Sequence, residues 1–165
     1  MIILATQGLG KSYAASILDG VKDIDIMNFR GDPESYADAL IKASDDDNIA
    51  LGNISAEIMS ELNKRGEKFL IFAPVFSKDF TEEEAENYML LKEIIFGRLV
   101  LRKTQNERNV AWLEKVKRNF DSWCDIDFFT KYVSRTEIRP MTLSVNNVAS
   151  LLSGTKPIPT YCKDR

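Results

Sequence analysis

The chain has 165 residues, of which 44% are hydrophobic and 28% charged, and its formal net charge is −3 at pH 7. This composition is typical of one globular domain with a sizeable core, and the acidic balance argues against a generally basic nucleic-acid-binding surface. Histidine is absent and the two cysteines, Cys124 and Cys162, lie far apart in the sequence, which excludes a histidine-based triad and a classical zinc site. With no apolar run of membrane-spanning length, we expect a cytoplasmic protein whose thiols are reduced.

The first element is an apolar run over residues 1–5 that predicts a buried strand. A helical pattern over 13–18 follows after a glycine-rich segment that reads Ala5-Thr6-Gln7-Gly8-Leu9-Gly10-Lys11-Ser12. A glycine-rich segment between a strand and a helix is the context of a phosphate-binding loop, or P-loop, with Ala5 where the first glycine usually stands. An ordinary glycine-rich turn is the weaker alternative, because the match extends over eight consecutive residues.

Each part of this motif has a chemical role. Glycines let backbone N–H groups turn inward around phosphate oxygens, and the following helix adds the positive end of its dipole. Lys11 would reach the β- and γ-phosphates, and the Ser12 hydroxyl would ligate Mg²⁺. We therefore predict a triphosphate site whose phosphate-binding residues are Gln7, Gly8, Leu9, Gly10, Lys11, Ser12 and Tyr13.

Strand and helix patterns alternate along the rest of the chain. Strands are predicted over 23–27, 49–52, 69–76 and 138–143, and helices over 34–44, 55–66, 81–96, 109–123 and 144–153. Ser144 is expected to cap the last helix. The alternation predicts an α/β fold in which a parallel sheet of about five strands has helices on both faces and binds its ligand at the carboxyl ends of the strands. Residues 1–154 would form one domain, and 155–165 an irregular tail.

The P-loop and the order of elements together resemble the small P-loop nucleoside and nucleotide kinases, the adenylate-kinase-like group, and within it small phage-encoded proteins. The similarity extends to about Trp123, with weaker support to Gly154, and its one specific motif is the segment 5–12. Four further segments support the resemblance only through their order along the chain and their composition, namely 23–30, 52–62, 69–74 and 119–123. The resemblance implies a three-layer P-loop NTPase fold with a small helical lid at about 96–110, and the host cytoplasm as the location of a phage-encoded protein.

Kinases of this group place an acidic residue near the acceptor at the end of the second strand. Asp25 is the candidate to orient or deprotonate the acceptor, and Asp23 is the second; the alternative for both is a solvent-facing side of a short strand. Arg30 follows and would hold an acceptor phosphate as a bidentate fork, with a plain surface arginine as the alternative.

The resemblance also implies lid arginines that offset the charge developing on the transferred phosphoryl group. Arg98 and Arg102 are the catalytic candidates, and Lys103 and Arg108 are further lid residues. The pattern does not indicate which arginine enters the site, and a solvated helix face is the alternative for all four.

The strands lack the terminal acid of a Walker-B motif, since the third ends in Gly52-Asn53 and the fourth in Ala73-Pro74. We expect a Mg²⁺-dependent phosphotransferase that uses ATP or another triphosphate such as GTP, with a nucleoside, nucleotide or polynucleotide acceptor. The missing acid motivates the alternative, a non-catalytic nucleotide-binding module that acts as a sensor or binds a partner. The acidic net charge disfavours a nucleic acid end as the acceptor.

Three aromatic residues recur on one face of the predicted helix over 109–123, namely Trp112, Phe120 and Trp123. Their spacing is typical of a buried face, so we expect them in the core rather than stacked on a base. Cys124 is expected to be a small buried apolar residue.

Overall fold

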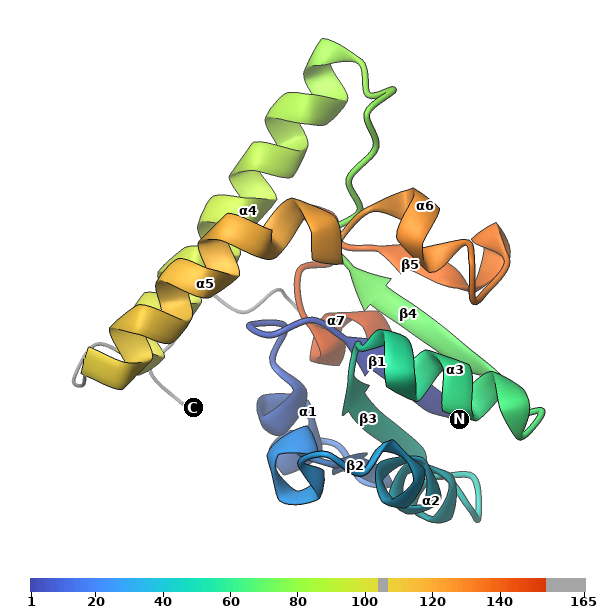
Figure 1. Ribbon diagram of the computed structural model, residues 1–165. Helices are drawn as coiled ribbons and strands as arrows, with labels where there is room; N and C mark the ends of the chain where they lie inside the picture. The colour runs from blue at the N-terminus through green and yellow to red at the C-terminus, as the bar shows by residue number, and fades with distance from the viewer. Residues whose placement is uncertain (104–106, 154–165) are drawn as a thin grey trace.

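The computed structural model describes residues 1–103 and 107–153 (Figure 1). Its centre is a five-stranded, all-parallel sheet of order β2-β3-β1-β4-β5. The strands are β1 (Ile2–Ala5), β2 (Val21–Asp23), β3 (Ile49–Asn53), β4 (Phe69–Ala73) and β5 (Ile138–Pro140). The predicted α/β fold with a parallel sheet is confirmed, and the strand that leads into the glycine-rich loop is the central one.

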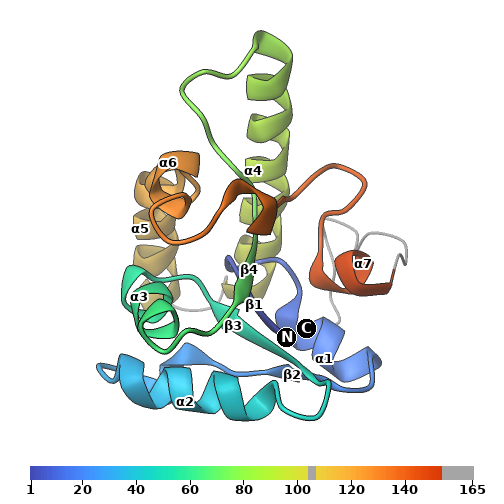
Figure 2. The same cartoon turned by 90° about the vertical axis from the view of Figure 1, so that its right-hand side faces the viewer.

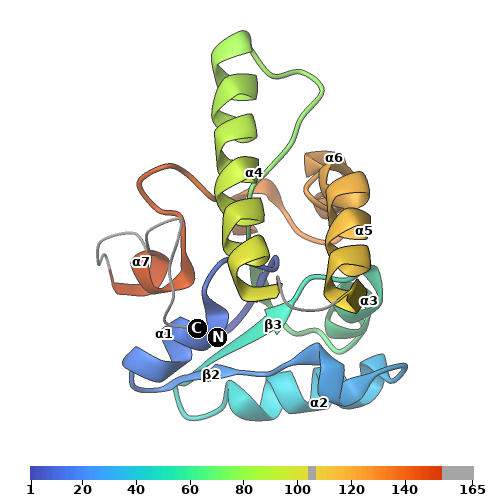
Figure 3. The same cartoon turned by 90° about the vertical axis from the view of Figure 1, so that its left-hand side faces the viewer.

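Helices connect successive strands and cover both faces of the sheet. They are α1 (Lys11–Ile17), the 3₁₀ turn η1 (Ile26–Phe29), α2 (Pro33–Ala43), α3 (Ala56–Lys64), α4 (Glu82–Lys103), α5 (Glu107–Trp123), α6 (Ile126–Phe129), the 3₁₀ turn η2 (Arg135–Glu137) and α7 (Val148–Ser153). The two side views place α1 with α7 on one side of the sheet and α3 on the other (Figures 2 and 3).

The alternation of side chains along the central strand divides the core into two halves. Ile3 and Ala5 point to the half that contains residues of α1, α4, α5 and α7. Ile2 and Leu4 point to the half that contains residues of α2 and α3. All four side chains are buried, which is why β1 is continuously apolar rather than alternating with polar residues.

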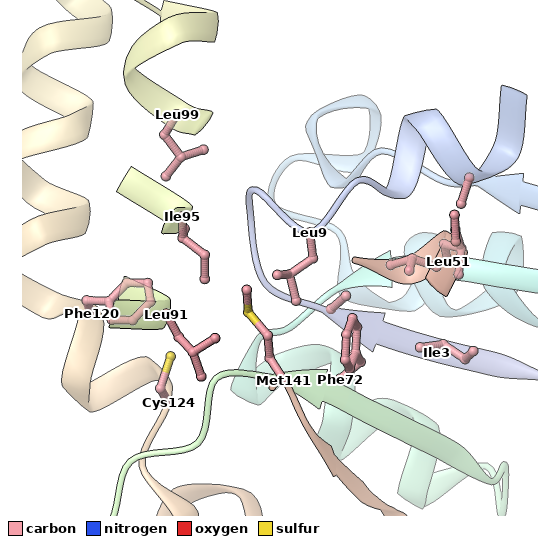
Figure 4. Packing of buried hydrophobic residues seen from close by; sticks show 14 of the residues in the cluster. Ile3, Leu9, Leu51, Phe72, Leu91, Ile95, Leu99, Phe120, Cys124 and Met141 are labelled. Atoms are coloured by element: carbon pink, nitrogen blue, oxygen red, sulfur yellow. The ribbon is translucent and has the colours of Figure 1, made fainter. Parts of the chain in front are cut away.

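The helices α4 and α5 form a hairpin that projects from the carboxyl-end edge of the sheet (Figure 1). Thr81 and Glu84 open α4 with reciprocal hydrogen bonds between side chain and backbone N–H, and Glu82, Glu83 and Glu84 make its first turn acidic. Figure 4 shows Leu91, Ile95 and Leu99 of α4 on one side of the core and Leu9 of the loop on the other. The second half of α4, toward the turn of the hairpin, therefore packs against the loop.

The fourth strand ends at Ala73 rather than Phe76, and the fifth at Pro140 rather than Leu143. Two further predicted boundaries are wrong for the same physical reason, a side chain that caps a turn. The second strand ends at Asp23 rather than Met27, because the carboxylate of Asp25 accepts the Met27 N–H and starts η1. The last helix begins at Val148, where Asn147 accepts the Ser150 N–H, and Ser144 belongs to the preceding turn.

The region expected as a lid includes the turn of the same hairpin, where α4 ends and α5 begins. The helix predicted to end near 96 continues to Lys103, and α5 starts at Glu107. Residues 104–106 and the tail 155–165 lie outside the described residues, so the lid and the tail stay predictions. Among residues 1–103 and 107–153, no helix is both long and apolar enough to cross a membrane.

Candidate functional site

The glycine-rich segment forms a tight loop between the central strand and α1. Gly8 and Gly10 have φ angles of 80° and 75°, the left-handed region that side chains with a Cβ rarely adopt. A Cβ on Gly8 would also lie 3.1 Å from Cγ2 of Ile95 in α4. Both the backbone conformation and the closeness of α4 therefore require glycine at position 8.

Lys11 lies across the start of this loop. Its side chain is 9% exposed, and Nζ donates hydrogen bonds to the carbonyl oxygens of Ala5 and Thr6 at 3.0 and 3.1 Å. The ammonium group thus joins the first helical residue to the end of β1. This contact fixes the positive charge at the mouth of the loop, at the carboxyl end of the central strand.

Ser12 and Asp23 meet although they come from different elements. The Ser12 hydroxyl donates to Oδ2 of Asp23, the last residue of β2, at 2.7 Å. A hydroxyl and a carboxylate side by side are hard oxygen ligands of the kind that Mg²⁺ prefers. Among the described residues no group of three or more acidic, histidine or cysteine side chains is placed to hold a metal ion, so a metal here would take its other ligands from phosphate and water.

Tyr36 holds the ends of two neighbouring strands in place beside this pair. Its hydroxyl donates to the carbonyl of Ile24 at 2.7 Å and accepts the Asn53 N–H at 3.0 Å. Burial raises the pKa of Tyr36, so the hydroxyl stays protonated as these bonds require. Gly52 makes room for it, because a Cβ there would lie 3.0 Å from the tyrosine oxygen and 2.9 Å from Leu40.

A small polar cavity of about 70 Å³ lies at the loop, and we call it the phosphate cradle after the ligand that the sequence predicts there. Its lining residues are Gln7, Gly8, Gly10, Lys11, Ser12, Asp23, Asp25, Asn53 and Arg102. All except Asn53 were predicted from the sequence, whose pattern places them in three separate segments. Asn53 was missed as a site residue, although its place at the end of a strand beside the central one was the available signal.

Several predicted residues lie elsewhere. The side chain of Leu9 is fully buried in the core, so its predicted contact with a phosphate would be made by its backbone N–H and stays a prediction. Tyr13 packs partly buried against the same core. The side chains of Lys103 and Arg108 lie outside the described residues, and their lid role stays a prediction.

Arg98 is buried beneath the loop rather than displayed on a helix face. It is 5% exposed and donates to the carbonyls of Gly8 at 3.0 Å and Asn146 at 2.7 Å, and to Oδ1 of Asn146 at 2.9 Å. Close by, the Val148 N–H donates to the Leu9 carbonyl at 2.8 Å. Arg98 therefore joins α4, the loop and the start of α7, whereas Arg102, one turn further along α4, lines the cradle.

A second cavity, of about 480 Å³, adjoins the cradle and shares Gln7 and Asn53 with it. Its walls come from the start of the loop, η1, the start of α3, and the α4–α5 hairpin. We call it the aromatic cavity, because its lining includes Trp112, Phe120, Trp123 and Phe128. Burial of Phe120 is confirmed, but Trp123 is 40% exposed, so the expectation that it lies in the core is wrong.

Cys124 also lines the aromatic cavity and is buried, as expected. Burial raises the pKa of its thiol, which keeps it protonated and weakly nucleophilic at neutral pH. Its role is therefore that of a small apolar wall residue.

Arg30 lines a third hollow of about 500 Å³, between η1 and the starts of α2 and α3. This hollow shares three lining residues with the aromatic cavity, namely Ile26, Ser55 and Glu57. Arg30 is exposed and does not line the cradle, and its predicted contact with an acceptor phosphate stays untested.

Comparisons with protein families, curated proteins and solved structures give no match. The features of the molecule that bear on function are therefore the motif, the sheet and the geometry of the two adjoining cavities.

Proposed function

We propose that the protein is a Mg²⁺-dependent P-loop phosphotransferase that transfers the γ-phosphoryl group of ATP or another triphosphate to a nucleoside, nucleotide or polynucleotide acceptor. The observation that carries the proposal is the direct junction, at Gln7 and Asn53, between the phosphate cradle and a cavity large enough for a ring-containing ligand. A kinase needs two such sites in contact, one for the donor phosphates and one for the acceptor.

The position of Lys11 indicates which of the two cavities would hold the triphosphate and which the acceptor. In a P-loop this lysine contacts the β- and γ-phosphates, and here its ammonium group lies beside Ala5 and Thr6 at the start of the loop. The γ-phosphate would therefore sit at that end. Ala5 and Thr6 also line the aromatic cavity, which makes it the acceptor side.

The oxygen atoms of Ser12 and Asp23 are a ligand set that fits a magnesium ion. Ser12 would ligate it directly, and Asp23 would orient Ser12 and hold the hydration shell of the ion. When bound, Mg²⁺ would neutralise charge on the β- and γ-phosphates. Asp23 then belongs to the donor side rather than to the acceptor, and it offers the carboxylate that the third and fourth strands lack.

The remaining groups fit the chemistry of transfer. The acceptor hydroxyl oxygen would bond to the γ-phosphorus while the bond from that phosphorus to the β–γ bridging oxygen breaks and the nucleoside diphosphate leaves. Asp25, which lines the cradle, would take the hydroxyl proton, and Lys11 and Arg102 would offset the negative charge on the transferred group.

The role given to Asp23 predicts a magnesium-specific defect in Asp23→Asn. The substitution keeps the shape of the side chain but removes the charge, so we expect the Mg²⁺ concentration that half-saturates the ATP-dependent thermal shift to rise about 10- to 100-fold. ATP binding measured in EDTA should not weaken, because the substitution removes a charge that repels metal-free phosphate. Asp79→Asn, at an exposed carboxylate away from both cavities, serves as the matched control. An unaltered Mg²⁺ dependence in Asp23→Asn would remove Asp23 from the metal site.

A thermal-shift experiment separates the kinase from the sensor alternative. Wild-type protein is titrated with ATP, GTP, nucleosides and nucleoside monophosphates, each with and without Mg²⁺. A ligand that binds the folded state alone adds about 2.7 kcal/mol at a hundredfold excess over its dissociation constant. Separate shifts with a triphosphate and with an acceptor support the kinase. A shift with triphosphates alone supports the sensor, and no shift with any triphosphate contradicts both.

A further inference from the structure

The aromatic cavity contains both tryptophans of the chain, Trp112 and Trp123. The two residues are three helical turns apart on α5, and Phe120 stands between them on the same helix. Phe120 packs edge-on against Phe96 at a centroid distance of 5.1 Å, which holds its ring in a fixed orientation. The wall formed by α5 is therefore aromatic along much of its length.

The exposure of Trp123 is the feature that core packing does not explain. Its side chain is 40% exposed, while its neighbours on the inner face of α5, Val116 and Phe120, are 2% and 3% exposed. A large aromatic ring at the rim of a hollow offers a flat apolar surface at little conformational cost. Stacking on such rings is the usual way in which proteins hold a nucleobase.

The side chains between the aromatic walls and the cradle are amides, a hydroxyl and carboxylates. Gln7 and Asn53 lie at the junction, Asp25 lines the cradle, and Ser55 and Glu57 line the aromatic cavity at the start of α3. These groups pair with the hydroxyls of a sugar, whereas the carboxylate of Glu57 would repel a phosphate placed in the aromatic cavity. Among the described residues that line the aromatic cavity, Glu57 is the one charged side chain.

We propose that the aromatic cavity binds an uncharged nucleoside, with its base against Trp112 and Trp123 and a sugar hydroxyl directed toward Asp25. This proposal rests on the proposed function and narrows it, because it names a nucleoside rather than a nucleoside monophosphate as the acceptor. The third hollow, which holds Arg30, shares no lining residue with the cradle and then has no part in binding the transferred group.

Intrinsic fluorescence tests the proposal directly, since every tryptophan of the chain lines this cavity. Wild-type protein, excited near the red edge of tryptophan absorption, is titrated with ribo- and deoxyribonucleosides and with their 5′-monophosphates, without any triphosphate. We expect a saturable change with at least one nucleoside and binding at least tenfold weaker for its monophosphate. Equal or tighter binding of the monophosphate would overturn the proposal.

Two variants locate the binding. Trp123→Ala, followed through the fluorescence of Trp112, should weaken nucleoside binding about tenfold or more, as expected for loss of a stacking ring. Trp112→Phe keeps an aromatic ring and the fold, and should weaken it less. Leu90→Ala removes a side chain that is 47% exposed on α4 outside the cavity, and it should leave binding unchanged. Unchanged affinity in folded Trp123→Ala would contradict the proposed site.

The experiments distinguish failure of the nucleoside proposal from failure of the proposed phosphotransferase function. If Mg²⁺–ATP stabilises the protein but no nucleoside changes the fluorescence, the nucleoside proposal is wrong and the phosphate cradle stands. If nucleosides bind but no triphosphate does, the aromatic cavity is a base site and the proposed phosphotransferase function is wrong.

Discussion

Lys11→Met is expected to abolish detectable stabilisation by Mg²⁺–ATP and to lower the rate of phosphoryl transfer by about 10²- to 10³-fold or more. The reason is that the ammonium group is the positive charge that the loop holds at its mouth, beside Ala5 and Thr6. Methionine keeps the apolar stem of the side chain but removes the charge. Binding is measured by thermal shift and transfer with γ-labelled triphosphate.

The control for this substitution is Lys22→Met, which removes an exposed lysine from β2 and should change neither quantity. Because Lys11 also donates to two loop carbonyls, the unfolding of Lys11→Met without ligand is recorded beside its binding. A folded Lys11→Met protein that binds and transfers like wild type would show that the loop is not a triphosphate site.

Arg98→Met is expected to lower the free energy of unfolding by about 3 kcal/mol or more. The guanidinium donates to three oxygen atoms of Gly8 and Asn146 in a buried position, and methionine would leave those acceptors without these bonds. The loop carbonyl at Gly8 is among them, so ATP binding should weaken as well. Urea denaturation with and without Mg²⁺–ATP measures both effects.

Arg102→Met is the matched comparison, one helical turn further along the same helix. Arg102 is exposed and lines the cradle, so its loss should change the free energy of unfolding by no more than about 0.5 kcal/mol. Transfer should nevertheless fall by about 10²-fold. The opposite pattern, a stable Arg98→Met and an unstable but fully active Arg102→Met, would contradict the roles given to the two arginines.

The alternation of strands and helices could be predicted because it depends on short-range patterns. The apolar run that forms β1 is buried on both faces, and Thr81 with Glu84 marks the start of α4 within four residues. The end of the second strand could not be predicted from hydrophobic alternation, because a single carboxylate, Asp25, closes a turn there.

The site residues, too, include some that short-range sequence patterns predict and some that depend on tertiary packing. The loop residues are consecutive, so their proximity is local, whereas Asp23 and Asp25 are predicted through the resemblance to small kinases, which implies an acidic residue at the end of the second strand. The sequence treats Arg98 and Arg102 alike, since they lie one turn apart on a helix. Which of them is buried depends on how closely α4 approaches Gly8, and that distance is a property of tertiary packing.

The aromatic residues of α5 also show that a sequence pattern does not determine burial. Phe120 and Trp123 lie at core-like spacing, and the first is buried while the second stands at the rim of a cavity. The difference arises because the starts of α3 and η1 face the end of α5 across a hollow instead of filling it. Helical periodicity identifies an inward face but does not show whether the opposite wall contacts it.

The most direct test of the central claim is a transfer assay with γ-³²P-labelled ATP and GTP against a panel of nucleosides, nucleoside monophosphates and oligonucleotide ends, with Mg²⁺, for wild type and Lys11→Met. The account predicts label on at least one acceptor with wild type and none above background with Lys11→Met. Equal labelling by both proteins, or no labelled acceptor from a wild-type protein shown to bind Mg²⁺–ATP, would contradict it.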